Sequence, residues 1–143
     1  MEKNNNLLKL IAKWFLECGD KNNDVLSKDK LCMLLYYAKG FYYIACHEEL
    51  YSEDIIKIDS GLDIEGFSFN DLDNVNLDSL EDRIKIVLEF VYEKVGVVDE
   101  ERLLSILKDE TLYQNCKVGD KISGTEIERF FKKNKSFSSK YTF

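Results

Sequence analysis

The stretch Ser27–Cys46, SKDKLCMLLYYAKGFYYIAC, decides how the chain folds. Its apolar and aromatic residues recur at intervals of three and four, the spacing that places side chains on one face of an α-helix. Ser27 suits the N-cap position, because its hydroxyl can accept a hydrogen bond from a backbone N–H of the first turn. The stretch therefore predicts a helix that is buried on most sides at the centre of the core.

Gly40 lies within this helix, where glycine costs about 1 kcal/mol relative to alanine. A glycine at such a position is typical of a place where another element comes close. We therefore expect a second helix to approach the chain at Gly40. The alternative is a glycine that is merely tolerated.

A second amphipathic helix precedes this stretch. Residues 5–18 carry a broad stripe of leucine, isoleucine and aromatic side chains, which predicts one helical face turned toward the core. Gly19 follows the last apolar residue and predicts the end of the helix. Residues 20–24 are then expected to form a loop.

Three further helices are predicted in the second half of the chain. Each begins with a capping signal, either a capping box or a single N-cap residue. Gly96 predicts the end of the first of them. The signals are Asp78 with Glu81, Asp99, and Ser123 with Glu126.

Residues 48–76 interrupt the helical pattern as an irregular excursion. Alternation at Ile56 and Ile58, and again at Phe67 and Phe69, is compatible with a short two-stranded ribbon. Structureless loops longer than about 12–15 residues are uncommon in compact domains, so this segment should be functional or flexible. Its apolar content argues against wholesale disorder.

Together these elements predict an all-α fold, a compact bundle of five to six helices with the acidic excursion after the second. A chain of 143 residues, of which 45% are hydrophobic, can bury one core. We expect a single domain over residues 1–134 and a flexible basic tail over residues 135–143. No apolar run approaches the roughly 20 residues of a membrane span and the polar start resembles no targeting signal, so a cytoplasmic location is expected.

The net charge of −7 is distributed unevenly. The segment from His47 to Asp82 contains many acids and a single base, Lys57, whereas no acid follows Glu128. Nucleic-acid binding needs a cationic surface, so the middle of the chain should repel nucleic acid and favour a basic protein. The alternative is that the acidic stretch is only a solvated loop and the basic end a frayed tail.

Motifs for catalysis or for a cofactor are lacking, including phosphate loops, the GxSxG elbow, HExxH and the EF-hand. The four cysteines form no CxxC pair and the chain has one histidine, so neither a metal nor another cofactor is expected. Cys46 and His47 would point about 100° apart on a helix, which disfavours a catalytic pair. We expect no enzyme. A hydrolase using acids of the excursion, and duplex DNA binding by residues 129–140, are the alternatives.

Two runs of residues resemble the signature of a known family. The run KLCMLLYYAKGFY at Lys30–Tyr42, followed by ELYSEDI at Glu49–Ile55, is similar to the Panacea antitoxin domain. That phage-associated family is also called SocA-like or GepA-like. With weaker echoes in residues 88–107 and 119–131, the resemblance spans roughly residues 5–134.

The resemblance implies a compact helical protein that binds and neutralises a toxin protein, or an adaptor that delivers its toxin to a protease. The chain departs from the family pattern after Ile55. The run KIDSGL at Lys57–Leu62 stands where the family has Tyr-Gly-Pro-Val. Lys108 stands near the place of a usual histidine, and Leu112-Tyr113 replaces a Pro-Trp pair. These departures lie in or beside the excursion, so a changed partner is compatible with the same scaffold.

The leading hypothesis is therefore a non-catalytic protein-binding module that neutralises a toxin. The alternative is a phage- or prophage-encoded inhibitor of a host defence protein, such as an anti-CRISPR, whose acids imitate nucleic-acid phosphates. Aromatic anchors concentrate interface energy and acids steer a basic partner. The oligomeric state is left open. The expected contact surface comprises Tyr51, Glu53, Asp54, Asp59, Asp63, Phe67, Phe69 and Asp71.

Overall fold

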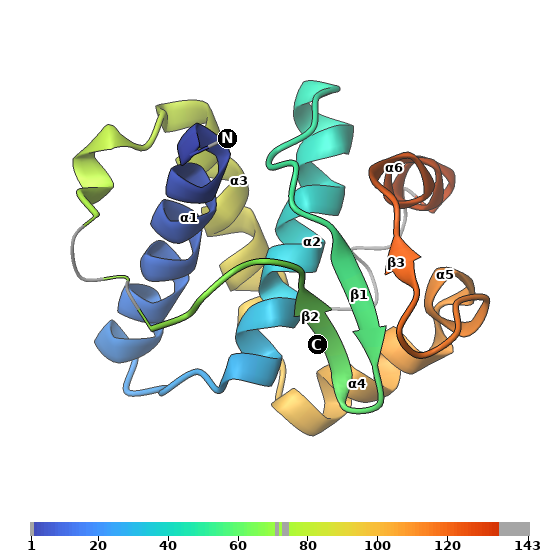
Figure 1. The fold of residues 1–143 in the computed structure, drawn as a ribbon. Coiled ribbons are helices and arrows are strands. Elements are labelled where there is room, and N and C mark those ends of the chain that lie inside the picture. The colour runs from blue at the N-terminus through green and yellow to red at the C-terminus, as the bar shows by residue number, and fades with distance from the viewer. Residues whose placement is uncertain (1, 71, 73–74, 135–143) are drawn as a thin grey trace.

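The computed structural model describes residues 2–70, 72 and 75–134, with side chains from residue 7 onward. This part of the chain is mostly helical, as predicted, but also contains a small three-stranded antiparallel sheet (Figure 1). The helices are α1 (Glu2–Lys21), α2 (Lys28–Cys46), α3 (Asp82–Val91), α4 (Glu100–Asp109), α5 (Thr111–Gln114) and α6 (Gly124–Lys133). The strands are β1 (Ile55–Ile58), β2 (Gly61–Ile64) and β3 (Lys121–Ile122), and two single turns are η1 (Leu77–Ser79) and η2 (Tyr92–Gly96).

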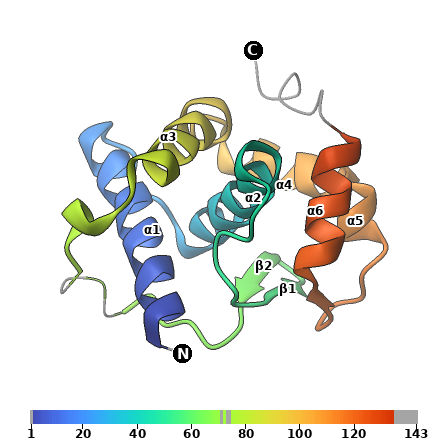
Figure 2. The same cartoon turned by 90° about the horizontal axis from the view of Figure 1, so that it is seen from above.

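Helix α2 is the centre of the fold, as its sequence predicts. It packs against α1 and α3 on one side, against α6 on the other and against β2 (Figure 2). Every residue from Lys30 to Tyr43 is buried. The Ser27 hydroxyl accepts a hydrogen bond from the backbone N–H of Lys30 at 3.1 Å, which confirms the predicted N-cap. His47 ends the helix in the left-handed region, at φ 58°.

Phe131 of α6 packs directly against Gly40 of α2. A β-carbon at Gly40 would overlap the ring carbons of Phe131. That ring is fully buried, with edge contacts to Tyr36 at 5.5 Å and to Phe41 at 5.4 Å between centroids. The predicted approach of another helix at Gly40 is confirmed.

The excursion contains a hairpin that belongs to the core. Ile55 of β1 lies opposite Ile64 of β2 and opposite Ile122 of β3, and all three side chains are buried. The expected irregular segment is therefore partly regular, because β3, which is remote in sequence, completes a sheet around β1. Phe67 and Phe69 lie beyond β2 rather than in a strand, so their alternation did not indicate one.

Two predicted helix boundaries are wrong. Helix α1 does not end at Gly19 but continues to Lys21. A β-carbon at the buried Gly19 would overlap the carbonyl oxygen of Asp24, so this glycine serves a close approach of the backbone. Nor do Asp78 and Glu81 form a capping box, because Asp78 lies in the turn η1 and α3 begins after Glu81 without a side-chain cap.

The later boundaries follow the sequence more closely. Asp99 accepts a hydrogen bond from the N–H of Glu101 and caps α4. Ser123 and Glu126 form both hydrogen bonds of a capping box at the start of α6. Gly96 is the last residue of the π-helical turn η2, which continues α3. The predicted tail, residues 135–143, lies outside the described residues.

Candidate functional site

Phe67 and Phe69 form an aromatic pair where the chain leaves the sheet. Their ring centroids are 4.6 Å apart with the rings at 87°, an edge-to-face arrangement. Both side chains are half-buried and pack against the core. The two phenylalanines that the sequence singled out are thus brought together, and each leaves part of its ring in contact with solvent.

Charged side chains border this pair. The Lys28 ammonium lies over the Phe69 ring, 5.4 Å from its centroid. The same ammonium is 3.7 Å from a carboxylate oxygen of Asp63, with both side chains well exposed. We call Phe67, Phe69, Lys28 and Asp63 the aromatic platform. It has the composition of a small binding surface, with aromatic side chains at its centre and charges at its rim.

Tyr51 does not belong to any exposed surface, which corrects its assignment to the contact surface. Its side chain is buried, and its hydroxyl donates a hydrogen bond to the carbonyl oxygen of Leu35 at 2.8 Å. Burial raises the pKa of Tyr51 well above its ordinary value. Glu53 also points partly inward, since one of its carboxylate oxygens is buried with no hydrogen-bond partner among the described residues.

The predicted acids are spread over the hairpin rather than gathered. Asp54 pairs with Lys121 at 3.5 Å, on the β3 side of the sheet. Asp59 is exposed in the turn between β1 and β2. Asp63 alone of the described acids lies on the aromatic platform. Asp71 lies outside the described residues.

Bases from other elements neutralise much of the acidic stretch, which the sequence analysis missed. Lys121 of β3 contacts Glu65 at 2.9 Å as well as Asp54, and these carboxylates raise its pKa. Arg83 of α3 pairs with Glu48 at 3.0 Å. The acidic run in the sequence is therefore not an uncompensated acidic surface in the fold.

Lys39 is the buried member of this set. The residue is 1% exposed, and its ammonium donates a hydrogen bond to the Glu53 carbonyl oxygen at 3.2 Å. It also lies 3.7 Å from Glu49 and 4.6 Å from the centre of the Tyr51 ring. Burial lowers the pKa of Lys39, and Glu49 opposes this shift. Lys39 stands between apolar and aromatic residues in the middle of α2, and this position could have signalled the buried pair.

Two buried polar groups show no arrangement for nucleophilic chemistry. Burial, reinforced by Asp63, raises the pKa of the Cys32 thiol to about 12, so the thiol is protonated at neutral pH and is a poor nucleophile. Glu110 is buried and accepts hydrogen bonds from the hydroxyls of Tyr36 at 2.9 Å and Tyr37 at 2.6 Å. These contacts tie α2 to the segment between α4 and α5.

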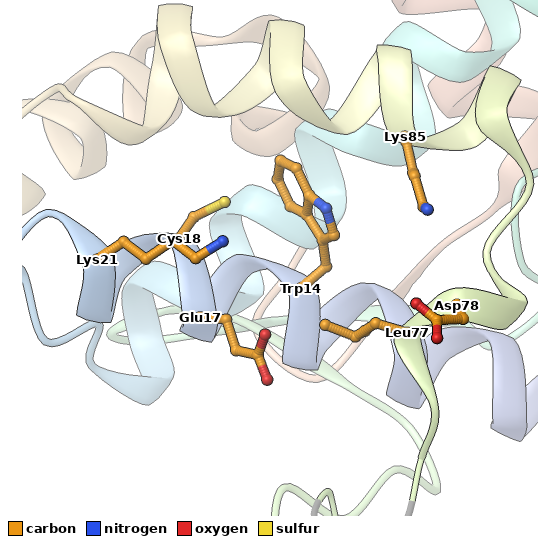
Figure 3. A pocket seen from close by; sticks show the side chains of 7 residues that line it. All are labelled: Trp14, Glu17, Cys18, Lys21, Leu77, Asp78 and Lys85. Carbon is orange, nitrogen blue, oxygen red and sulfur yellow. The ribbon is translucent and has the colours of Figure 1, made fainter.

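An open pocket of about 160 Å³ lies between α1, η1 and α3 (Figure 3). Trp14 of α1 stands in its middle, and Lys85 of α3 points into it from above. Its charges are mixed, and its volume is below the roughly 300–1,000 Å³ of most small-molecule sites. The lining residues are Trp14, Glu17, Cys18, Lys21, Leu77, Asp78 and Lys85.

Within residues 2–70, 72 and 75–134, no three histidine, cysteine, aspartate or glutamate side chains gather as a metal site requires. In the same part of the chain, no helix combines the length and the apolar character needed to cross a membrane.

No family model matches the chain, and no curated protein or solved structure matches it either.

Proposed function

We propose that this chain is a non-catalytic protein-binding module of the antitoxin class, which neutralises a toxin protein through the aromatic platform. The toxin as partner comes from the resemblance of Lys30–Tyr42 and Glu49–Ile55 to the Panacea antitoxin domain. The geometry of the platform supports it as the place of contact.

The observation that supports this contact most is the half-buried pair Phe67 and Phe69. Aromatic side chains that are already held in one conformation lose little entropy when a partner covers them. The mutual contact of the rings and the Lys28 ammonium over Phe69 restrict the pair in this way. The buried hairpin before it provides a rigid base, since Leu62 and Ile64 are fixed in the core.

The charge distribution favours a partner that binds the aromatic side chains over a partner that binds acids resembling nucleic-acid phosphates. An inhibitor that imitates nucleic acid needs acids without counter-charges. Asp63, Asp54 and Glu65 instead lie beside lysines. Inhibition of a host defence protein therefore stays the second hypothesis, in which the exposed Asp59 would contribute most.

The test removes the two rings. Phe67→Ala/Phe69→Ala is expected to abolish capture of the partner from the native host and to abolish growth rescue when chain and partner are co-expressed. The matched control is Phe90→Ala/Phe130→Ala, which removes one ring from α3 and one from α6, outside the platform. It should keep both activities. Circular dichroism of all variants verifies that they fold.

The partner must also be toxic by itself for the antitoxin class to hold. A captured protein that arrests growth alone, and no longer does so with this chain, supports the proposal. A captured nuclease of a defence system whose activity falls with this chain supports the second hypothesis. Full rescue by a folded Phe67→Ala/Phe69→Ala variant would remove the platform from the function.

A further inference from the structure

The pocket between α1, η1 and α3 is a surface that the proposed function does not use. Trp14 in its middle is half-buried, and its indole meets the buried ring of Phe15 edge-on at 5.5 Å between centroids. Lys13 donates a hydrogen bond to the carbonyl oxygen of Val75 at 3.2 Å, which ties the segment before η1 to α1. The pocket therefore presents an aromatic face that its neighbours hold in place.

The size of the pocket suits one aromatic ring. Its volume is about 160 Å³, and a cavity of about 150 Å³ accommodates benzene. Trp14 and Leu77 provide apolar surface in its lining. A second ring can contact the indole edge-on or offset, and such pairs are favourable beyond the burial of their area.

Four charged side chains also line the pocket, two acids and two bases: Glu17, Lys21, Asp78 and Lys85. Within the part of the chain that the structure describes, none of the four forms an ion pair. Glu17 and Lys85 are moreover half-buried. Each of these two charges has thus lost part of its water without gaining a counter-charge from the protein, which a bound ligand could supply.

The balance of charges selects the class of ligand. A simple anion would be attracted by the two lysines and repelled by the two acids, and a simple cation would meet the reverse. A zwitterion can place each of its charges beside the opposite charge of the pocket. In Figure 3, the indole of Trp14 lies between Lys85 above and Glu17 below. A small zwitterion that carries one aromatic ring is an aromatic amino acid.

We propose that this pocket binds a free aromatic amino acid. Its ring packs on Trp14, its carboxylate faces Lys85 and its ammonium faces Glu17. The pocket is built from α1, η1 and α3, whereas the rings of the aromatic platform lie beyond β2. The inference therefore stands apart from the proposed function, and neither depends on the other.

The fluorescence of Trp14 provides the test, because the chain contains one tryptophan and the signal therefore reports on this pocket. The full chain is titrated with L-phenylalanine, which does not absorb where tryptophan is excited. We expect a saturable change in emission with a Kd of about 1 mM, which is within the range for a ligand of this size. Emission that stays unchanged at tenfold that concentration would overturn the proposal.

Analogues of the ligand test its three groups separately. Hydrocinnamate lacks the ammonium, phenethylamine lacks the carboxylate and L-alanine lacks the ring. Each should bind the natural chain at least about fivefold more weakly, which is the upper range for an exposed ion pair. N-acetyl-L-phenylalaninamide carries neither charge and represents an aromatic side chain within a protein. If it bound as tightly as L-phenylalanine, the pocket would be a contact for a protein side chain and the proposal would be wrong.

Variants of the pocket assign each charge to its partner. Lys85→Gln should weaken L-phenylalanine about fivefold without weakening phenethylamine, and Glu17→Gln should do so without weakening hydrocinnamate. Lys94→Gln, which replaces a half-buried lysine of η2 outside the pocket, is the control and should keep the natural affinity. Natural affinity for L-phenylalanine in folded Lys85→Gln and Glu17→Gln variants would overturn the proposal. The series of analogues on the natural chain decides the matter if a variant does not fold.

Discussion

Replacing Gly40 with alanine tests the contact between α2 and Phe131 of α6. Two opposite effects on the free energy of unfolding are expected. Within a helix, alanine is favoured over glycine by about 1 kcal/mol. In this fold, however, the new β-carbon would overlap three ring carbons of Phe131. The ring is fully buried between Tyr36, Tyr37 and Phe41, so it has no free space into which it can move.

The magnitude follows from the balance of the two effects. Overpacking a well-filled core costs about 1–3 kcal/mol, and a ring enclosed on several sides belongs at the upper end of that range. Subtracting the gain in helix propensity leaves a net loss of about 2 kcal/mol in the free energy of unfolding. For a chain of this length the corresponding fall in melting temperature is about 4–8 °C.

Urea denaturation followed by circular dichroism measures this loss. The matched background is Phe131→Leu, since leucine lacks the distal ring carbons that a β-carbon at Gly40 would meet. In that background Gly40→Ala should cost less than about 1 kcal/mol, and this difference is the coupling between the two sites. A Gly40→Ala variant as stable as the natural chain, or equal losses in both backgrounds, would refute the packing argument.

Two further predictions concern the core and the start of α6. Cys32 should make the free energy of unfolding fall as pH rises above 9. In the native fold the pKa of its thiol is raised to about 12, whereas in the unfolded chain the thiol has its ordinary pKa of 9.0. Above pH 9 the unfolded chain therefore loses a proton that the native chain keeps, and this favours unfolding. In urea denaturation between pH 9 and pH 12, Cys32→Ala should reduce the fall in the free energy of unfolding by about 1.4 kcal/mol per pH unit. An unchanged dependence of stability on pH would contradict the raised pKa of Cys32. Ser123→Ala removes half of a capping box and should cost about 1 kcal/mol. Ser105→Ala, at an exposed position within α4, is the control and should not lower the free energy of unfolding. Equal losses in Ser123→Ala and Ser105→Ala would show that the Ser123 cap does not stabilise α6.

Local signals in the sequence predicted the helical part of the fold. Ser27 and Ser123 cap helices because the hydrogen bonds they form depend only on the next few residues. Gly40 predicted a close helix for a similar reason, since glycine within an aromatic helix has a local cost that must be offset by packing. Gly19 has the same role but stands near the end of an apolar stripe, where glycine also predicts a C-cap.

What the sequence did not reveal depends on pairs that are distant in the chain. Lys121–Ile122 is too short to be recognised as a strand, yet it pairs with β1 and brings Lys121 to Asp54. Tyr51 was predicted to lie on the contact surface, and only the fold shows that its hydroxyl reaches the carbonyl oxygen of Leu35. The aromatic pair of the candidate site was predicted from residue type, whereas its Lys28 contact required the structure.

The central place of β1 has a consequence for synthesis on the ribosome. β1 and β2 are adjacent in the chain and can pair soon after they emerge, whereas β3 and α6 emerge only after the intervening helices α3, α4 and α5. Until then one edge of β1 has no neighbouring strand, and the face of α2 at Gly40 lacks the ring of Phe131. Open strand edges and uncovered aromatic surfaces promote aggregation. Until α6 emerges, the nascent chain therefore presents the surfaces that chaperones protect.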